Sequence, residues 1–276
     1  MGGAGSGYQL GSDAAELERL DLQGRVLAPA TRMILQAAGV RRDMRVLDLG
    51  SGAGDAAFAA AELAGPAGEV VGIDQSPDAV AMATARAAGR GLSNVRFVAG
   101  DIRDRAPDGP FDAIIGRLVL MYAPDPAAVL RTQAGVLRPG GVVAPIEFDL
   151  HSARSLPSTP LVGQALSWLG EAFTRAGVDP ALGPRLWAVL QAAGLQPSGM
   201  IGVQPHFGPE DPDGAAILAG IVRTVLPLIE RTGVATAAEV GADTLQQRLS
   251  GELATSAAVF AHPMLISAWG TARQPK

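Results

Sequence analysis

The sequence of 276 residues contains no cysteine at all. Disulfide bridges, thiolate metal ligands and cysteine nucleophiles are therefore excluded for these residues. Histidine is scarce as well: there are three, His151, His206 and His262, and they lie too far apart in the sequence to form a metal-ligand motif. We expect no metal site.

Positive charge and long apolar runs are also in short supply. The 22 Lys and Arg residues are outnumbered by 27 Asp and Glu residues, and the net charge of −5 has the wrong sign for neutralising phosphates. No uninterrupted apolar stretch approaches the roughly 18 residues that a membrane span needs, and the Gly-rich start lacks the basic and apolar regions of a secretory signal. We expect a cytoplasmic protein whose partner is a small molecule, neither a nucleic acid nor a membrane. The oligomeric state stays open, a homodimer included.

What the sequence does have is 48% hydrophobic residues, enough for a full core, in short runs that alternate with helical patterns. The runs are apolar on both faces, which is typical of parallel strands covered by helices on two sides. We predict an α/β fold with a doubly wound, mostly parallel sheet, whose strands all end at one ligand-binding rim. The five strands expected first are 44–49, 69–74, 94–99, 111–116 and 142–148.

The alternating pattern does not extend over the whole chain, which we interpret as a single domain, 1–276. Residues 1–40 are predicted to form an N-terminal helical cover and 41–150 the ligand-binding core. Residues 151–194 and 212–262 are read as helical lid insertions, with strands expected at 198–203 and 265–271. An alternative for the insertions is an extra layer on the edge of the sheet.

The chemistry is carried by the turn Asp48-Leu49-Gly50-Ser51-Gly52-Ala53-Gly54 between the first strand and a helix. Glycines there let the backbone approach a ligand, and the helix start offers free N–H groups. Such a turn alone also fits a dinucleotide site.

Asp74 and Asp101, at the ends of the next two strands, suit a ribose and an adenine amine. Three carboxylates on one rim disfavour a pyrophosphate and favour a positively charged ligand.

With these motifs in this order, the segment 44–148 resembles the class I S-adenosylmethionine-dependent methyltransferases of the small-molecule type. Gly100-Asp101-Ile102, the strand beginning Phe111-Asp112 and the turn Arg138-Pro139-Gly140-Gly141 match further motifs of that family. The resemblance implies a seven-stranded sheet with a reversed last strand, S-adenosyl-L-methionine as cofactor and methyl transfer as activity.

The resemblance also assigns roles to residues of this chain. It implies contacts to the methionine part from Asp48, Gly50, Ser51, Gly52, Arg117 and Leu118, to the ribose from Asp74, to the adenine from Gln75, Gly100, Asp101 and Ile102, and a covering aromatic ring from Tyr8. Alternatives are a turn-capping Asp101, a solvated Gln75, an Arg117 paired with an acidic neighbour, and a Tyr8 in an unstructured tail.

A hydroxyl acceptor usually needs a base, and histidine titrates closest to neutrality. We predict His151, just after the fifth strand, as that base, with Glu147 as its carboxylate; the alternative is a surface histidine. Trp168, Phe173 and Trp187 either line an apolar acceptor pocket or pack as core residues.

The expected function is therefore methyl transfer to O, N or C of a small, apolar metabolite by in-line displacement. The Ala-, Gly- and Arg-rich, Lys-poor composition is associated with bacteria whose enzymes of this kind decorate secondary metabolites. Alternatives are a protein of this fold that binds the cofactor without transferring methyl, as a binding module or rearrangement catalyst, and a nicotinamide-dependent oxidoreductase.

Overall fold

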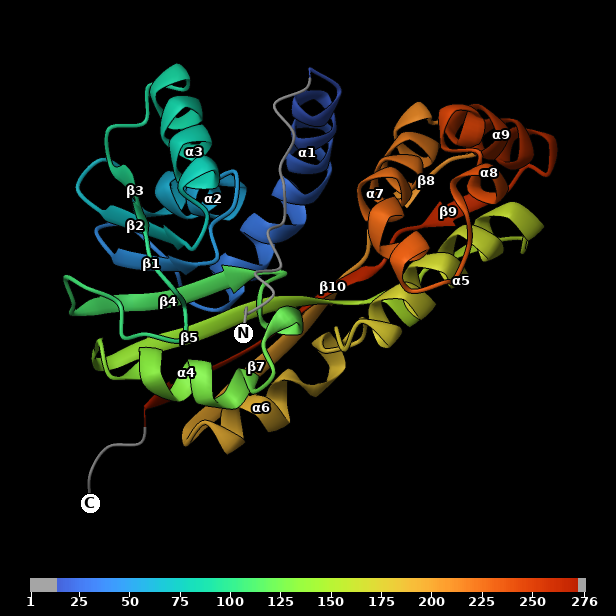
Figure 1. Cartoon of the computed structure of the whole chain (residues 1–276). Helices are drawn as coiled ribbons and strands as arrows, with labels where there is room; N and C mark the ends of the chain where they lie inside the picture. Colours follow the sequence, from blue (N-terminus) through green and yellow to red (C-terminus); the bar gives the residue numbers. More distant parts are fainter. Residues whose placement is uncertain (1–13, 273–276) are drawn as a thin grey trace, which may run out of the picture.

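The computed structural model describes residues 14–272, and a seven-stranded sheet runs through its centre (Figure 1). The strand order is β3-β2-β1-β4-β5-β10-β7. The first five strands pair in parallel, and β10 lies antiparallel between β5 and β7. The strands are β1 (Arg45–Leu49), β2 (Glu69–Asp74), β3 (Val95–Ala99), β4 (Phe111–Arg117), β5 (Leu137–Asp149), β7 (Leu195–Val203) and β10 (Met264–Ala272). The predicted fold, with its reversed last strand, is confirmed.

Helices cover both faces of this sheet (Figure 1). On one face lie α1 (Ala14–Ala37), α2 (Asp55–Ala64) and α3 (Pro77–Gly89), and on the other α4 (Pro126–Ala134) and α6 (Leu186–Ala192). Successive strand residues enter opposite cores: Val46 packs with the first set of helices and Leu47 with the second. This two-sided burial is why the strands are apolar throughout.

Beyond the carboxyl ends of the strands stands a separate layer, here called the cap. It contains α5 (Pro160–Arg175), α7 (Pro212–Arg231), α8 (Ala237–Val240), α9 (Ala242–Thr255) and a small sheet of β6 (Arg154–Leu156), β9 (Val259–Ala261) and β8 (His206–Phe207). The cap has its own apolar core, which includes Leu169, Leu218, Leu249 and Phe260. Within residues 14–272 there are also single-turn 3-10 helices. One follows β4 (Leu120–Tyr122), one follows β5 (Leu150–Ser152) and one precedes α6 (Gly183–Arg185).

Two features of this arrangement differ from the expectation. Helix α6, assigned by its sequence position to the lid, lies against β7 and β10 in the sheet layer. The short strands of the cap were not expected, because two or three residues are too few to show a period. Helix α1 joins the two layers, since Leu27 and Ile34 enter the sheet core while Leu22 and Val26 contact the cap core.

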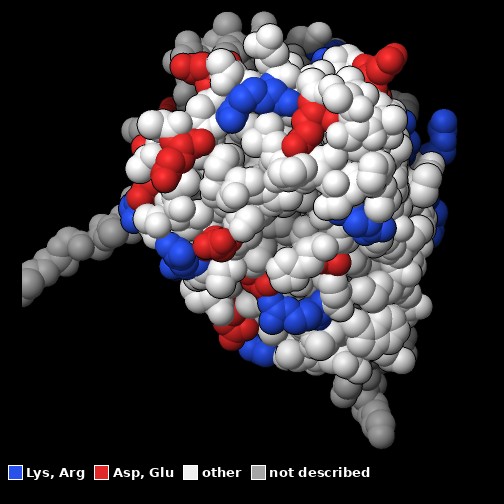
Figure 2. Space-filling view, turned by 90° about the vertical axis from the view of Figure 1, so that its right-hand side faces the viewer, with Lys and Arg blue, Asp and Glu red and all other residues white. Residues whose placement is uncertain are grey.

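Within residues 14–272, α7 is the one helix long and apolar enough, by length and composition, to cross a membrane. Half of that stretch is buried in the structure, where α7 packs against α5, α9 and α1. It is the central helix of the cap. Figure 2 looks onto the cap side of the molecule, where charged side chains of both signs are scattered among uncharged ones and neither sign forms a continuous patch.

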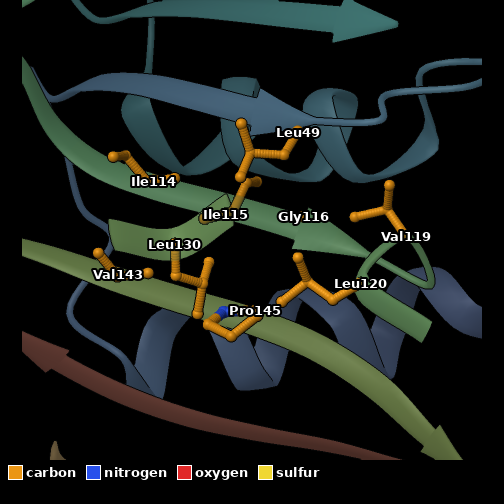
Figure 3. A pocket seen from close by; sticks show the side chains of 9 residues that line it. All are labelled: Leu49, Ile114, Ile115, Gly116, Val119, Leu120, Leu130, Val143 and Pro145. Carbon is orange, nitrogen blue, oxygen red and sulfur yellow. The ribbon is translucent and has the colours of Figure 1, made fainter. Parts of the chain in front are cut away.

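The sheet is tightly packed below its rim, where side chains of β1, β4, β5 and α4 meet (Figure 3). The space among them has no room for a water molecule. It is lined by Leu49, Ile114, Ile115, Gly116, Val119, Leu120, Leu130, Val143 and Pro145. The rim above therefore rests on a rigid base.

A buried carboxylate fixes the turn that follows β4. Oε1 of Glu147, on β5, accepts hydrogen bonds from the backbone N–H groups of Val119 at 3.0 Å and Leu120 at 2.7 Å. Its Oε2 is buried with no hydrogen-bond partner. Burial raises the pKa of Glu147 from 4.5 to about 8.

This raised pKa predicts a pH-dependent stability. The folded state binds the Glu147 proton more tightly than the unfolded state, so the free energy of unfolding falls as the pH rises from about 4.5 through about 8, by up to about 1.4 kcal/mol per pH unit. Glu147→Gln keeps an acceptor for the turn and cannot ionise. We expect its stability relative to the native protein to increase from pH 5 to about pH 8 and then to level off in urea unfolding. Exposed Glu210→Gln is the control, and parallel native and Glu147→Gln profiles would contradict the assignment.

Candidate active site

The glycine-rich turn lies between β1 and α2, and its glycines serve different purposes. Gly50, Gly52 and Gly54 all adopt left-handed backbone conformations, with φ of 59°, 50° and 92°. A Cβ on Gly50 would lie 2.2 Å from Cγ2 of Val119, whereas a Cβ on Gly52 would meet nothing within 4 Å. Gly50 thus allows close packing on the turn that Glu147 holds, and Gly52 borders open space that a ligand can enter.

Buried polar atoms without partners cluster at this turn. Asp48, near the end of β1, is fully buried, and neither of its carboxylate oxygens has a hydrogen-bond partner. The Ser51 hydroxyl is buried and unpartnered too. Burial raises the pKa of Asp48 to about 7, and Arg117 opposes that rise. Buried polar groups are rarely left unsatisfied, so these atoms point to a missing ligand.

Asp74 ends β2 beside this turn and ties two loops together. Its carboxylate accepts the backbone N–H of Gly52 and that of Ser76, both at 2.9 Å. Each oxygen keeps a second lone pair, so the half-buried carboxylate can still accept ligand hydroxyls. The next residue, Gln75, is exposed.

Asp101 follows β3 and is not free in this structure. It accepts the backbone N–H of Arg103 at 2.8 Å and forms an ion pair with the Arg103 side chain, which holds the pKa of Asp101 below its usual range. Arg103 was not foreseen from the sequence; its own side chain is 69% exposed. Gly100 donates its backbone N–H to the Asp74 carbonyl, and Ile102 is half-buried against the sheet core. An adenine amine would have to share Asp101 with Arg103 or displace it.

Arg117, at the end of β4, lies next to an acidic residue, as in the alternative that the sequence offered for it. Its guanidinium donates to Thr31 of α1 at 3.0 Å and lies 3.9 Å from Asp55 at the start of α2. Asp55 also pairs with Arg86 at 3.0 Å. Arg117 therefore links α1 to the glycine-rich turn, and burial lowers its pKa.

An apolar pocket opens between the rim of the sheet and the cap. It encloses about 90 Å³ within a wider space of about 710 Å³ that reaches solvent. The side chains come from the ends of β4 and β5, from α1, α5 and α7, and from the corner between β9 and β10. They belong to Gln23, Leu118, Met121, Tyr122, Phe148, Leu150, Leu166, Leu169, Phe173, Leu218, Ile221, Thr224, Val225, Phe260, His262 and Pro263. No Asp, Glu, Lys or Arg is among these lining residues.

The expected acid–base pair is not assembled here. His151 is exposed and donates its backbone N–H to Asp149, while Glu147 is fully buried at the turn after β4. Within residues 14–272 no hydrogen bond joins the two side chains, because Glu147 points into the sheet layer and His151 lies on the surface. The histidine that lines the pocket is His262, which the sequence analysis did not select.

Of the aromatic residues considered for an acceptor pocket, one lines the pocket and the others do not. Phe173 lines the pocket, Trp168 is 8% exposed within the cap core, and Trp187 is exposed on α6 in the sheet layer. Tyr8 lies outside the described residues.

Comparison with known proteins adds an independent line of evidence. Residues 41–169 match a family described as "Methyltransferase domain". Nocamycin O-methyltransferase of Saccharothrix syringae is 40% identical over 114 residues, 41% of this chain and 41% of its own. Aklanonic acid methyltransferase DauC of Streptomyces sp. (strain C5) is 36% identical over 143 residues, 48% of this chain and 64% of its own. The matches thus cover less than two thirds of each relative.

Among solved structures, the [4+2]-cyclase SpnF is similar in fold, with a TM-score of 0.56 and 21% identity over 90% of this chain and 83% of that one. The family match falls on the segment that carries the glycine-rich turn and the three strand-end carboxylates. Both relatives named above are methyltransferases, and the sheet order and reversed β10 agree with the fold. Over residues 41–169 the chain thus matches a methyltransferase family, and its seven-stranded sheet has the fold of the class I S-adenosylmethionine-dependent methyltransferases.

Proposed function

We propose that this protein binds S-adenosyl-L-methionine at the carboxyl ends of β1 to β3 and transfers its methyl group to a small, apolar molecule in the pocket under the cap. The observation that carries the proposal is the pair of unpartnered, buried polar groups, Asp48 and Ser51, beside the open space at Gly52. A ligand with an ammonium group would supply the missing partners for a buried carboxylate.

The cofactor roles proposed for the other residues follow from their positions. Asp74 offers both carboxylate oxygens to a ribose, and Gly100, Asp101 and Ile102 border the adenine, with Gln75 exposed beside it. Leu118, next in sequence to the buried Arg117, reaches the pocket. The carboxylates of Asp48 and Asp74 interact electrostatically and suit a cation better than a pyrophosphate, which argues against a nicotinamide dinucleotide.

The pocket supports an apolar acceptor because its lining carries no charged side chain. When bound, the cofactor supplies an already activated methyl group. The task left to the chain is to align the acceptor and exclude water, and both can come from the rim and the cap. The atom that receives the methyl group is an oxygen, nitrogen or carbon of the acceptor. We propose that the enzyme acts in bacterial secondary metabolism in the cytoplasm; the relatives named for nocamycin and aklanonic acid support a small-molecule acceptor.

A second candidate keeps the cofactor pocket without methyl transfer. Two observations support this second candidate. The fold is similar to that of a [4+2]-cyclase, and neither His151 nor Glu147 is among the residues that line the pocket. Fold alone does not decide between these chemistries.

The first prediction from this site concerns cofactor affinity. Asp74→Asn should weaken S-adenosylmethionine binding by about 10- to 100-fold, because charge-assisted hydrogen bonds to the ribose are lost. Isothermal calorimetry measures the affinities for S-adenosylmethionine and for NAD. The native protein should bind S-adenosylmethionine and should not bind NAD. Asp78→Asn, an exposed carboxylate four residues along, is the matched control. Binding of NAD, or equal affinity in the Asp74 variant, would refute the assignment.

A second prediction follows from the pKa of Asp48, which burial raises to about 7. Only the ionised carboxylate attracts an ammonium group, so affinity for S-adenosylmethionine should fall as the pH drops from about 7 to 5.5, by up to tenfold per unit. Proton release on binding, measured by calorimetry in two buffers, checks this. Asp48→Asn should bind more weakly and with no such slope; a slope that persists in this variant assigns the effect elsewhere.

The third prediction tests transfer itself. Incubation with methyl-labelled cofactor and a panel of neutral phenols, enols and polyketide-like rings should label at least one member. Leu218→Trp, which fills the pocket from α7, should reduce labelling more than tenfold and leave cofactor affinity intact. Cofactor binding without any labelling across the panel would favour the second candidate.

A further inference from the structure

His262 occupies the corner between β9 and β10, where the chain passes from the cap into the sheet. It is fully buried. Its backbone N–H donates to Pro205 at 3.0 Å, and its carbonyl accepts from Nε2 of Gln204 at 2.8 Å. Its ring lies edge-on to Phe148, with the centroids 5.4 Å apart, and near Phe260 at 6.4 Å. The imidazole is therefore held in one place and orientation.

The hydrogen bond made by one ring nitrogen determines what the other can do. Nδ1 of His262 is 2.9 Å from the carbonyl oxygen of Pro263. A carbonyl oxygen only accepts, so Nδ1 carries the hydrogen and Nε2 of the neutral ring is left with a lone pair. Burial lowers the pKa of His262 to about 4, so the ring is neutral at physiological pH. Nε2 is thus a hydrogen-bond acceptor.

This acceptor has no partner in the protein. Nε2 of His262 is buried and makes no hydrogen bond, and the residue lines the apolar pocket under the cap. The other lining residues with polar side chains are Gln23, Tyr122 and Thr224. An unsatisfied acceptor in apolar surroundings costs free energy until a ligand donor reaches it.

The charge of the pocket narrows the class of donor. The lining residues include no Lys or Arg, so a carboxylate or a phosphate dianion would enter without a counter-ion, and neither carries a proton to donate. They include no Asp or Glu either, so an aliphatic ammonium group would be buried unpaired. A neutral hydroxyl avoids both penalties and donates one hydrogen bond.

We propose that Nε2 of His262 accepts a hydrogen bond from a hydroxyl group of a neutral, largely apolar acceptor, and that this contact sets the specificity of the pocket. The proposal rests on the proposed function, because it deepens the description of the same acceptor site. His262 is a binding residue in this proposal, and the hydroxyl that it holds need not be the atom that is methylated.

The test compares a hydroxyl ligand with its methyl ether, which lacks the donor, and with an anion built on the same ring. With the full chain, 2-naphthol should bind roughly three- to tenfold more tightly than 2-methoxynaphthalene, the fold-change that one neutral hydrogen bond supplies. The 2-naphthoate anion should bind most weakly. Fluorescence titration gives all three affinities. Equal binding of naphthol and its methyl ether by the native protein would overturn the proposal without any variant.

Variants then assign the preference to one atom. His262→Phe, which fits the surrounding phenylalanines, should abolish the naphthol preference, and His262→Gln, which carries an acceptor at a similar reach, should retain part of it. His206→Phe removes an exposed histidine on β8 of the cap that does not line the pocket. This variant should leave the naphthol preference unchanged. A preference that survives in His262→Phe would overturn the proposal.

Calorimetry with S-adenosylmethionine on the same proteins separates this proposal from the proposed function. Cofactor affinity should be the same in the native protein and both His262 variants, because His262 is not among the residues assigned to the cofactor. If the native protein binds no S-adenosylmethionine yet prefers naphthol, the proposed function fails while the pocket assignment stands.

Discussion

The hydrogen bonds from the Val119 and Leu120 backbone to the buried Glu147 carboxylate are the constraint on which both halves of the site depend. They fix the turn after β4. On one side of that turn, Val119 closes against Gly50 so tightly that no Cβ fits between them. On the other side, Leu118 and Met121 form part of the acceptor pocket. One buried group thus sets the position of the glycine-rich turn relative to the pocket under the cap, and the proposed methyl transfer between them would need such precise alignment.

A second constraint acts from the opposite direction, through helix α1. Arg117 donates to Thr31 on α1 and approaches Asp55 at the start of α2, while the apolar side chains of α1 contact both the sheet core and the cap core. Gln23 of the same helix lines the pocket. The helix therefore couples the cap to the glycine-rich turn. A movement of the cap that shifts α1 would change the contacts of Arg117 with Thr31 and Asp55.

The parts of the structure that could be predicted from sequence are those encoded by neighbouring residues. Strands such as 69–74 and the turn of Gly50, Gly52 and Gly54 have local signals, because apolar runs and glycine spacing need no knowledge of the rest of the chain. His262 had no such signal. Its burial depends on Phe148 and Phe207, which are distant in sequence and meet it only in the tertiary structure. The contact of Nδ1 with the carbonyl oxygen of Pro263 is local, but it depends on a backbone conformation that the sequence pattern does not reveal. Glu147 shows the converse error: its position near the rim suggested chemistry, while its hydrogen bonds are to the backbone.

The two ligand regions differ in electrostatics in a way that suits two unlike substrates. The proposed cofactor side carries Asp48, Asp74 and Asp101 at strand ends, and burial with the neighbouring negative charge of Asp74 raises the pKa of Asp48 to about 7. The lining of the pocket under the cap includes no Asp, Glu, Lys or Arg, and burial keeps its histidine, His262, neutral. This difference supports the proposal that a charged cofactor binds at the rim and a neutral acceptor in the pocket. Because a sulfonium loses its charge when it gives up its methyl group, the negative rim would hold the product less strongly than the substrate, which favours release after transfer.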